Sequence, residues 1–211
     1  MAMTDEFHKP TQFSGAKFES MTGGDDPAQI SRVAHDTAHA LLARVRTSAD
    51  PGVVERVVAF ADDHGIDAIA ELWSRSSPRS LPGALWRIYL MRALIRQDPQ
   101  GTSFYYQRGS ELVATIDQVV AGATSPTGPA EIILLADEIL RGVFEGDFGI
   151  ALDRAAAFCR VTSTGAASVA DDIDAANPDR ATELTTKALR LSHTATEFAA
   201  CARSWRSGKL D

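Results

Sequence analysis

Hydrophobic positions along this chain recur with helical spacing, and no segment alternates between apolar and polar residues over more than four positions. The pattern predicts an all-α fold. We expect a single-domain bundle of seven or eight helices over residues 27–211, with an arginine-bearing apolar helix at its centre. Residues 1–26 contain three glycines and five acidic residues and are expected to form a disordered or loosely attached tail, which Phe7, Phe13 and Phe18 could pin to a groove.

Start and stop signals divide the helical region into elements. Asp26-Pro27 and Asp50-Pro51 each place an N-cap residue before a proline, which suits the first turn of a helix. The segment GATSPTGP at 122–129 is a clear break. Further helices are expected over 66–73, 82–97, 103–120, 130–144 and 148–161, and a last one after the small-residue and acidic stretch 163–178.

The segment 74–97, SRSSPRSLPGALWRIYLMRALIRQ, carries five arginines and no acidic residue in a chain of net charge −7. Its second half is apolar almost all round a helix, and such a helix is normally buried. Buried guanidinium groups need charged or hydrogen-bonding partners. Arg87, Arg92 and Arg96 therefore either pair inside the protein or line a site for an anion.

In the internal-pairing interpretation, which we favour, Arg92 and Arg96 lie one turn apart on one helix face and reach carboxylates on the helical pair 130–161. Arg87 then extends to solvent from near the helix start. The carboxylates expected to pair with the arginines in this region are Glu138, Glu145, Asp147 and Asp153.

In the ligand-binding interpretation, Trp86 and Tyr89 flank Arg87, Arg92 and Arg96 in an aromatic and cationic pocket for a carboxylate, a phosphate or an acidic peptide. Trp86, Arg87 and Tyr89 are near the helix start and are the residues we expect to meet a ligand.

The last helix has the most regular pattern in the chain. Large side chains recur every seven residues and alanines occupy the interleaved positions, which is the spacing of a coiled-coil-like seam. We favour packing of this helix within its own bundle. The alternative is pairing across a homodimer through the same large residues. The large residues are Leu184, Leu191, Phe198 and Trp205, and the alanines are Ala188, Ala195 and Ala202.

His35 and His39 have the i, i+4 spacing that lets two histidines reach one metal ion. They lie opposite the apolar stripe of their helix, beside Arg32 and Arg46, and the glutamate of a zincin motif is absent. A solvated helix face is favoured over a metal or haem site, so no cofactor is expected.

The acidic balance, 28 Asp and Glu against 21 Lys and Arg, argues against a broad nucleic-acid-binding surface. Residues 57–73 have spacings compatible with a helix-turn-helix. Their second helix would present Asp67 and Glu71 to DNA, so an ordinary helical turn is favoured.

Cys159 and Cys201 each fall within an apolar helical pattern, which is typical of reduced core thiols in a cytosolic protein. No apolar run is long enough to span a bilayer and no secretory signal is recognised. The sequence therefore predicts a cytoplasmic protein.

Residues 80–96, SLPGALWRIYLMRALIR, and 142–161, GVFEGDFGIALDRAAAFCRV, resemble a family of helical actinobacterial proteins of about this size, some of which carry an RNA polymerase β-subunit label. The label implies at most a transcription-related setting. This chain is far too short for a polymerase β subunit and carries no motif of its catalytic machinery, so the resemblance assigns no functional residue.

Together these patterns predict a non-enzymatic cytosolic protein that binds a protein partner or an acidic ligand. The alternative is a small-molecule or metal-dependent helical enzyme using His35 and His39 or the carboxylates between 138 and 153.

Overall fold

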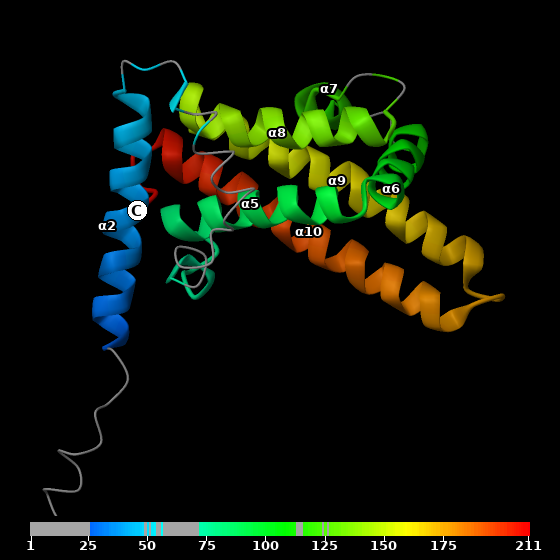
Figure 1. Cartoon of the computed structure of the whole chain (residues 1–211). Helices are drawn as coiled ribbons and strands as arrows, with labels where there is room; N and C mark the ends of the chain where they lie inside the picture. The colour runs from blue at the N-terminus through cyan, green and yellow to red at the C-terminus, as the bar shows by residue number, and fades with distance from the viewer. Residues whose placement is uncertain are drawn as a thin grey trace, which may run out of the picture.

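A computed structural model describes residues 26–48, 50, 52–53, 56, 72–112, 116–123, 125 and 127–211. All regular secondary structure in these ranges is α-helical, which confirms the predicted fold class (Figure 1). The helices are α2 (Pro27–Arg46), α5 (Leu81–Gln97), α6 (Pro99–Leu112), α7 (Asp117–Ala121), α8 (Pro129–Glu145), α9 (Phe148–Ile173) and α10 (Pro178–Arg206).

Some of the sequence predictions fall where the structure gives no description. The tail before Asp26, the helix expected from Pro51 and most of the helix expected over 66–73 lie outside the described residues. The helix-turn-helix alternative over 57–73 lies there for the same reason. Among the residues that are described, no helix has the length and apolarity needed to cross a membrane.

Local capping chemistry sets several helix starts. The Asp26 carboxylate accepts a hydrogen bond from the Ala28 amide (3.0 Å), and Asn177 accepts one from the Arg180 amide (3.2 Å). Each cap precedes a proline in the first turn, so the proline removes an amide that would have no helical partner. The predicted start at Asp26-Pro27 is confirmed.

The helix expected over 103–120 is wrong in its extent. The chain instead forms α6, which begins at Pro99 and ends at Leu112, and the short helix α7, which ends where Gly122 adopts a left-handed conformation (φ 79°). Both helices pack on α9, and a single straight helix could not place both segments there.

The helix expected over 148–161 is predicted too short, because α9 continues to Ile173. The small residues that suggested a loosely ordered stretch are buried instead, among them Gly165, Ala166 and Ala170. Their small side chains let α6 and α10 approach α9 closely. The segment is therefore an ordered part of the core.

α9 contacts α6, α7, α8 and α10, and α5 contacts α2, α6, α8 and α10. α9 and α10 run side by side in opposite directions and extend beyond the rest of the bundle as a hairpin (Figure 1). The end of this hairpin has a small core of its own, in which Ala166, Ala170 and Leu184 pack with Tyr105 of α6.

The seven-residue pattern of α10 faces the interior of its own chain. Leu184 and Phe198 are buried with the three interleaved alanines, while Leu191 and Trp205 are partly buried against the main core. These side chains therefore pack within their own chain, as the intrachain interpretation expects. The alternative homodimer through Leu184, Leu191, Phe198 and Trp205 stays a prediction.

The crossing of α6 and α9 depends on two glycines. A Cβ atom on Gly109 would lie 1.9 Å from the Val161 carbonyl oxygen, and one on Gly165 would lie 1.8 Å from the Tyr105 carbonyl oxygen. Both distances are far below van der Waals contact, so any other residue forces the two backbones apart. This crossing holds α6 against the middle of α9.

Candidate functional site

α5 carries the arginines that the sequence singled out. The Ser80 hydroxyl accepts a hydrogen bond from the Gly83 amide (3.3 Å), Pro82 occupies the first turn, and the helix ends before Pro99. One broad side of the helix is fully buried, including Ile88 and Ile95. The arginines on its flanks therefore project toward neighbouring helices.

Arg92 and Arg96 share one carboxylate on α8. Arg92 is only 2% exposed, and its Nε donates to Asp137 Oδ1 at 2.6 Å. Arg96, which is more exposed, donates from Nη2 to both Asp137 oxygens at 3.1 and 2.8 Å. This cluster of Arg92, Arg96 and Asp137 confirms the internal pairing predicted for the two arginines.

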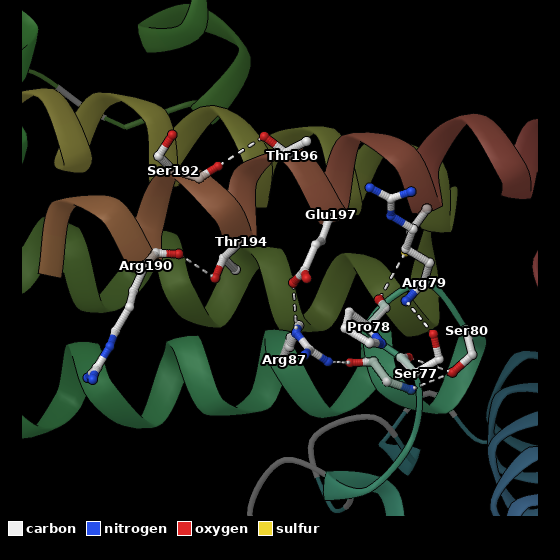
Figure 2. A network of polar contacts seen from close by, with 12 residues as sticks. Ser77, Pro78, Arg79, Ser80, Arg87, Arg190, Ser192, Thr194, Thr196 and Glu197 are labelled. Atoms are coloured by element: carbon white, nitrogen blue, oxygen red, sulfur yellow. Dashed lines mark hydrogen bonds and ion pairs between the residues drawn. The ribbon is translucent and has the colours of Figure 1, made fainter. Parts of the chain in front are cut away.

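Arg87 differs from its prediction. Its Nε lies 3.1 Å from Glu197 Oε2 of α10, and its Nη1 donates to the Gly83 carbonyl oxygen at 3.3 Å (Figure 2). Both side chains of the ion pair are only about a quarter exposed, at 24% and 26%. Arg87 therefore connects α5 to α10 and does not extend freely into solvent, because α10 supplies the carboxylate of Glu197.

Trp86 and Tyr89 stack on each other, with ring centroids 5.8 Å apart. Tyr89 lies about 200° round the helix from Arg87, so the aromatic pair and the Arg87–Glu197 ion pair occupy different sides of α5. The five residues proposed as one pocket are divided by the fold among the aromatic pair, the Asp137 cluster and the Glu197 ion pair.

The carboxylates named from the sequence have other partners. Glu138 pairs with Arg154 at 2.8 Å, Asp153 pairs with Arg206, and Asp147 caps the start of α9 through the Gly149 amide. Glu145 is exposed at the end of α8. None of the four forms an ion pair with α5 in the described structure.

Sequence reasoning missed both carboxylates that do pair with α5. Asp137 is four residues after Ile133 and three before Leu140, so it lies beside the apolar stripe of α8. Glu197 directly precedes the buried Phe198 and lies on the side of α10 toward α5. An acidic residue at the border of an apolar stripe was the available signal. Carboxylates that are close in sequence do not reveal it, because pairing depends on which helix face they occupy.

The two histidines have separate partners. His35 Nδ1 lies 2.7 Å from the Ser31 carbonyl oxygen, and His39 Nε2 lies 3.1 Å from Asp211 Oδ1. Among the described residues, no three His, Cys, Asp or Glu side chains are grouped so that they could hold a metal ion.

Both cysteines are buried and unpaired, and we expect neither thiol to react with a thiol reagent in the folded protein. Burial raises the pKa of Cys159 to about 12 and that of Cys201 to about 11. The thiolate is the reactive form, so little of it is present at neutral pH. Titration with Ellman's reagent should detect both thiols only after denaturant is added. A rapid reaction of either thiol without denaturant would contradict this placement.

A different surface of α5 remains open beside α10. We define the α5–α10 face as Leu90 and Leu94 of α5 together with Lys187, Arg190 and Thr194 of α10. Leu90 is 38% exposed and Leu94 is 55% exposed, although most of α5 is buried. Figure 2 shows Arg190 and Thr194 on the side of α10 toward α5, with the Arg190 side chain pointing in the direction of α5.

The register of the two helices follows from their polar contacts. Arg87 pairs with Glu197, and about three turns farther on, just after the end of α5, the charge of Asp98 acts on Lys187. The order of these two pairs means that α5 and α10 run in opposite directions, so by interpolation along the helices we infer that Leu90 lies near Thr194 and Leu94 near Arg190.

The α5–α10 face carries two cations, Lys187 and Arg190, and the charge of Asp98 acts on Lys187. Lys187 Nζ lies 4.7 Å from the centroid of the Tyr105 ring, and burial lowers its pKa while Asp98 opposes that shift. Arg190 is exposed and forms no ion pair with any described residue. The face therefore presents two leucines beside a guanidinium group that has no described carboxylate.

Comparisons with known proteins add no assignment to this geometry. The chain matches no protein-family model, no curated protein and no solved structure.

Proposed function

We propose that this chain is a non-enzymatic, cytosolic interaction protein whose α5–α10 face binds an acidic, apolar segment of a partner protein. The observation that carries the proposal is the exposure of Leu90 and Leu94 on α5 and of Arg190 on the side of α10 toward α5, where its guanidinium has no described carboxylate partner. The proposal does not use Arg87, Arg92 and Arg96 as ligand contacts, because each of them forms an ion pair with a carboxylate of the same chain.

The apolar part of the face suits a helix or an extended segment. Leu90 and Leu94 are one turn apart, so together they form a ridge along the surface of α5. Covering this ridge would remove apolar area from water and supply part of the binding free energy. A partner with two apolar side chains at the same spacing fits the ridge.

The polar part of the face selects the charge of the partner. Arg190 offers a planar group suited to a carboxylate, and the neighbouring ammonium of Lys187 adds positive potential. A leucine ridge bordered by cations favours acidic over basic amphipathic segments. The enzymatic alternative has less support, because His35 and His39 have separate partners.

Binding can be tested with a fluorescein-labelled synthetic peptide in which leucines recur at helical spacing and glutamates occupy the remaining face. We expect saturable binding to the full chain, measured by fluorescence anisotropy. The double variant Leu90→Asp/Leu94→Asp should weaken it at least about tenfold, or ~1.4 kcal/mol. Arg190→Glu should also weaken it, and more strongly at low salt, because exposed charges are screened by ions.

Matched controls separate this face from general surface effects. Leu134→Asp on α8 changes a leucine that is 60% exposed, and Arg203→Glu changes an exposed cation on another side of α10. Neither should alter binding. Equal binding of a peptide with lysine in place of glutamate would contradict the proposal. So would a stable dimer seen by sedimentation of the protein alone and lost in Leu90→Asp/Leu94→Asp, which would assign the face to a second copy.

A further inference from the structure

Tyr105 of α6 is fixed in place where α6 meets the hairpin of α9 and α10. The residue is only 6% exposed and packs with Ala166, Leu184 and Ala188. Its hydroxyl oxygen accepts a hydrogen bond from Nη2 of Arg180 at 3.5 Å. The ring is therefore held by apolar neighbours and by a polar contact at its hydroxyl group.

Lys187 of α10 lies over this ring. Its Nζ is 4.7 Å from the centroid of the Tyr105 ring, a distance at which the face of an aromatic ring attracts an ammonium group. The lysine side chain is half-buried and forms no ion pair with any described residue. Since a lysine has a long flexible stem, its contact with the ring determines where the charge lies.

The surroundings of Lys187 leave its charge available to a partner. Burial has the largest effect on the pKa of Lys187 and lowers it, while the charge of Asp98 raises it and that of Arg180 lowers it. The Asp98 carboxylate accepts a hydrogen bond from the Gly101 amide at 2.9 Å. Lys187 thus has no directly bound carboxylate, and solvent screens its charge less than that of a fully exposed lysine.

We propose that Tyr105 is a positioning residue of the α5–α10 face: its ring holds the Lys187 ammonium in place, and this fixed charge selects acidic partner segments. The inference rests on the proposed function, since it concerns the same face and the same partner. A carboxylate that meets a cation already held in place loses less conformational entropy on binding than one that must immobilise a free lysine. Arg190, which is exposed, lacks this support.

The test compares Tyr105→Leu, which removes the aromatic ring, with Tyr105→Phe, which keeps it, in the full chain. The probe is the labelled leucine and glutamate peptide used for the proposed function. We expect Tyr105→Leu to weaken probe binding at least about threefold, because the peptide must then immobilise Lys187 itself. Tyr105→Phe should bind the probe like the unmodified chain, since the phenylalanine ring presents the same face to the ammonium.

Lys187→Met shows whether Tyr105 acts through Lys187. In a chain that carries Lys187→Met, the further change Tyr105→Leu should weaken probe binding no more, because the two residues act as one unit. Circular dichroism checks that each variant is folded. An equal loss of binding in both backgrounds would overturn the inference, because Tyr105 would then affect the face by another route.

A second readout needs neither the probe nor a variant that removes the ring. Protons close to the face of an aromatic ring are shifted upfield in NMR spectra. The ε-methylene signals of Lys187 in the unmodified chain should therefore lie upfield of those of Lys209, which is exposed. Tyr105→Phe should preserve this shift. Lys187 signals at the same position as those of Lys209 would overturn the inference.

The two proposals fail in different ways. Probe binding that is the same in Tyr105→Leu as in the unmodified chain overturns the role of Tyr105 and leaves the proposed function standing. Upfield Lys187 signals in a chain that does not bind the probe overturn the proposed function, and with it the selection of a partner by Lys187.

Discussion

Replacing Gly165 with alanine is expected to destabilise the protein by about 3 kcal/mol or more, or to prevent folding. The added Cβ would lie 1.8 Å from the Tyr105 carbonyl oxygen and 2.7 Å from the Gly109 amide nitrogen. These are backbone atoms within a helix, so they cannot move aside as a flexible side chain would. Because folded domains are stable by only about 5–15 kcal/mol, separating α6 from α9 would use much of that margin. Urea unfolding followed by circular dichroism measures the change.

Gly142→Ala is the matched control for this effect. Gly142 also lies inside a helix, but a Cβ there would meet only the Ala151 Cβ, at an ordinary 3.6 Å. Alanine is the better helix former, so this variant should be more stable by about 0.5–1 kcal/mol. If Gly165→Ala behaved like Gly142→Ala, the close crossing of α6 and α9 would be wrong.

Asp137→Ala is expected to cost about 3–5 kcal/mol, because it removes the carboxylate from a buried guanidinium group. Arg92 is 2% exposed and cannot reach bulk water without disturbing α5 and α8. Arg96 loses the same acceptor but is 40% exposed and can turn to solvent. Most of the expected loss therefore arises at Arg92. Urea unfolding again gives the measurement.

Two comparisons identify the origin of that loss. Asp172→Ala breaks the exposed ion pair with Arg108 and should cost no more than about 1 kcal/mol. The double variant Arg92→Met/Asp137→Leu removes the buried charge together with the Asp137 carboxylate, so it should recover much of the stability lost in Asp137→Ala. A double variant as unstable as the single one would show that packing, and not an uncompensated charge, causes the loss.

Arg92→Ala distinguishes the two interpretations that the sequence left open for the arginine-bearing helix. Because Arg92 pairs with Asp137 in the folded protein, Arg92→Ala should mainly lower the free energy of unfolding, measured by urea unfolding. A fully stable Arg92→Ala variant would instead return the arginine to the role of a ligand contact. Our proposal therefore places the binding surface at Leu90, Leu94 and Arg190 instead of at Arg87, Arg92 and Arg96.

Parts of the fold that depend on local chemistry were predictable. Asp26-Pro27 correctly marked the start of α2, since capping and proline geometry involve only neighbouring residues. The break at 122–129 was equally clear, since glycine and proline act on the backbone where they stand. The end of α9 was not predictable in this way. The small residues after Val161 resemble a loop when judged alone, and they become helical because α6 and α10 pack on them.

The sequence by itself determined that the chain is helical, where several helices begin and which side of α10 is apolar, because these follow from capping and from 3.6-residue periodicity. Only the tertiary structure decided that Asp137 and Glu197 receive the arginines of α5, that Gly109 and Gly165 meet, and that Leu90 and Leu94 stay uncovered. Periodicity identifies a face that must be buried or paired. It does not identify the helix that covers that face, since contacts between distant segments depend on how all the helices pack together.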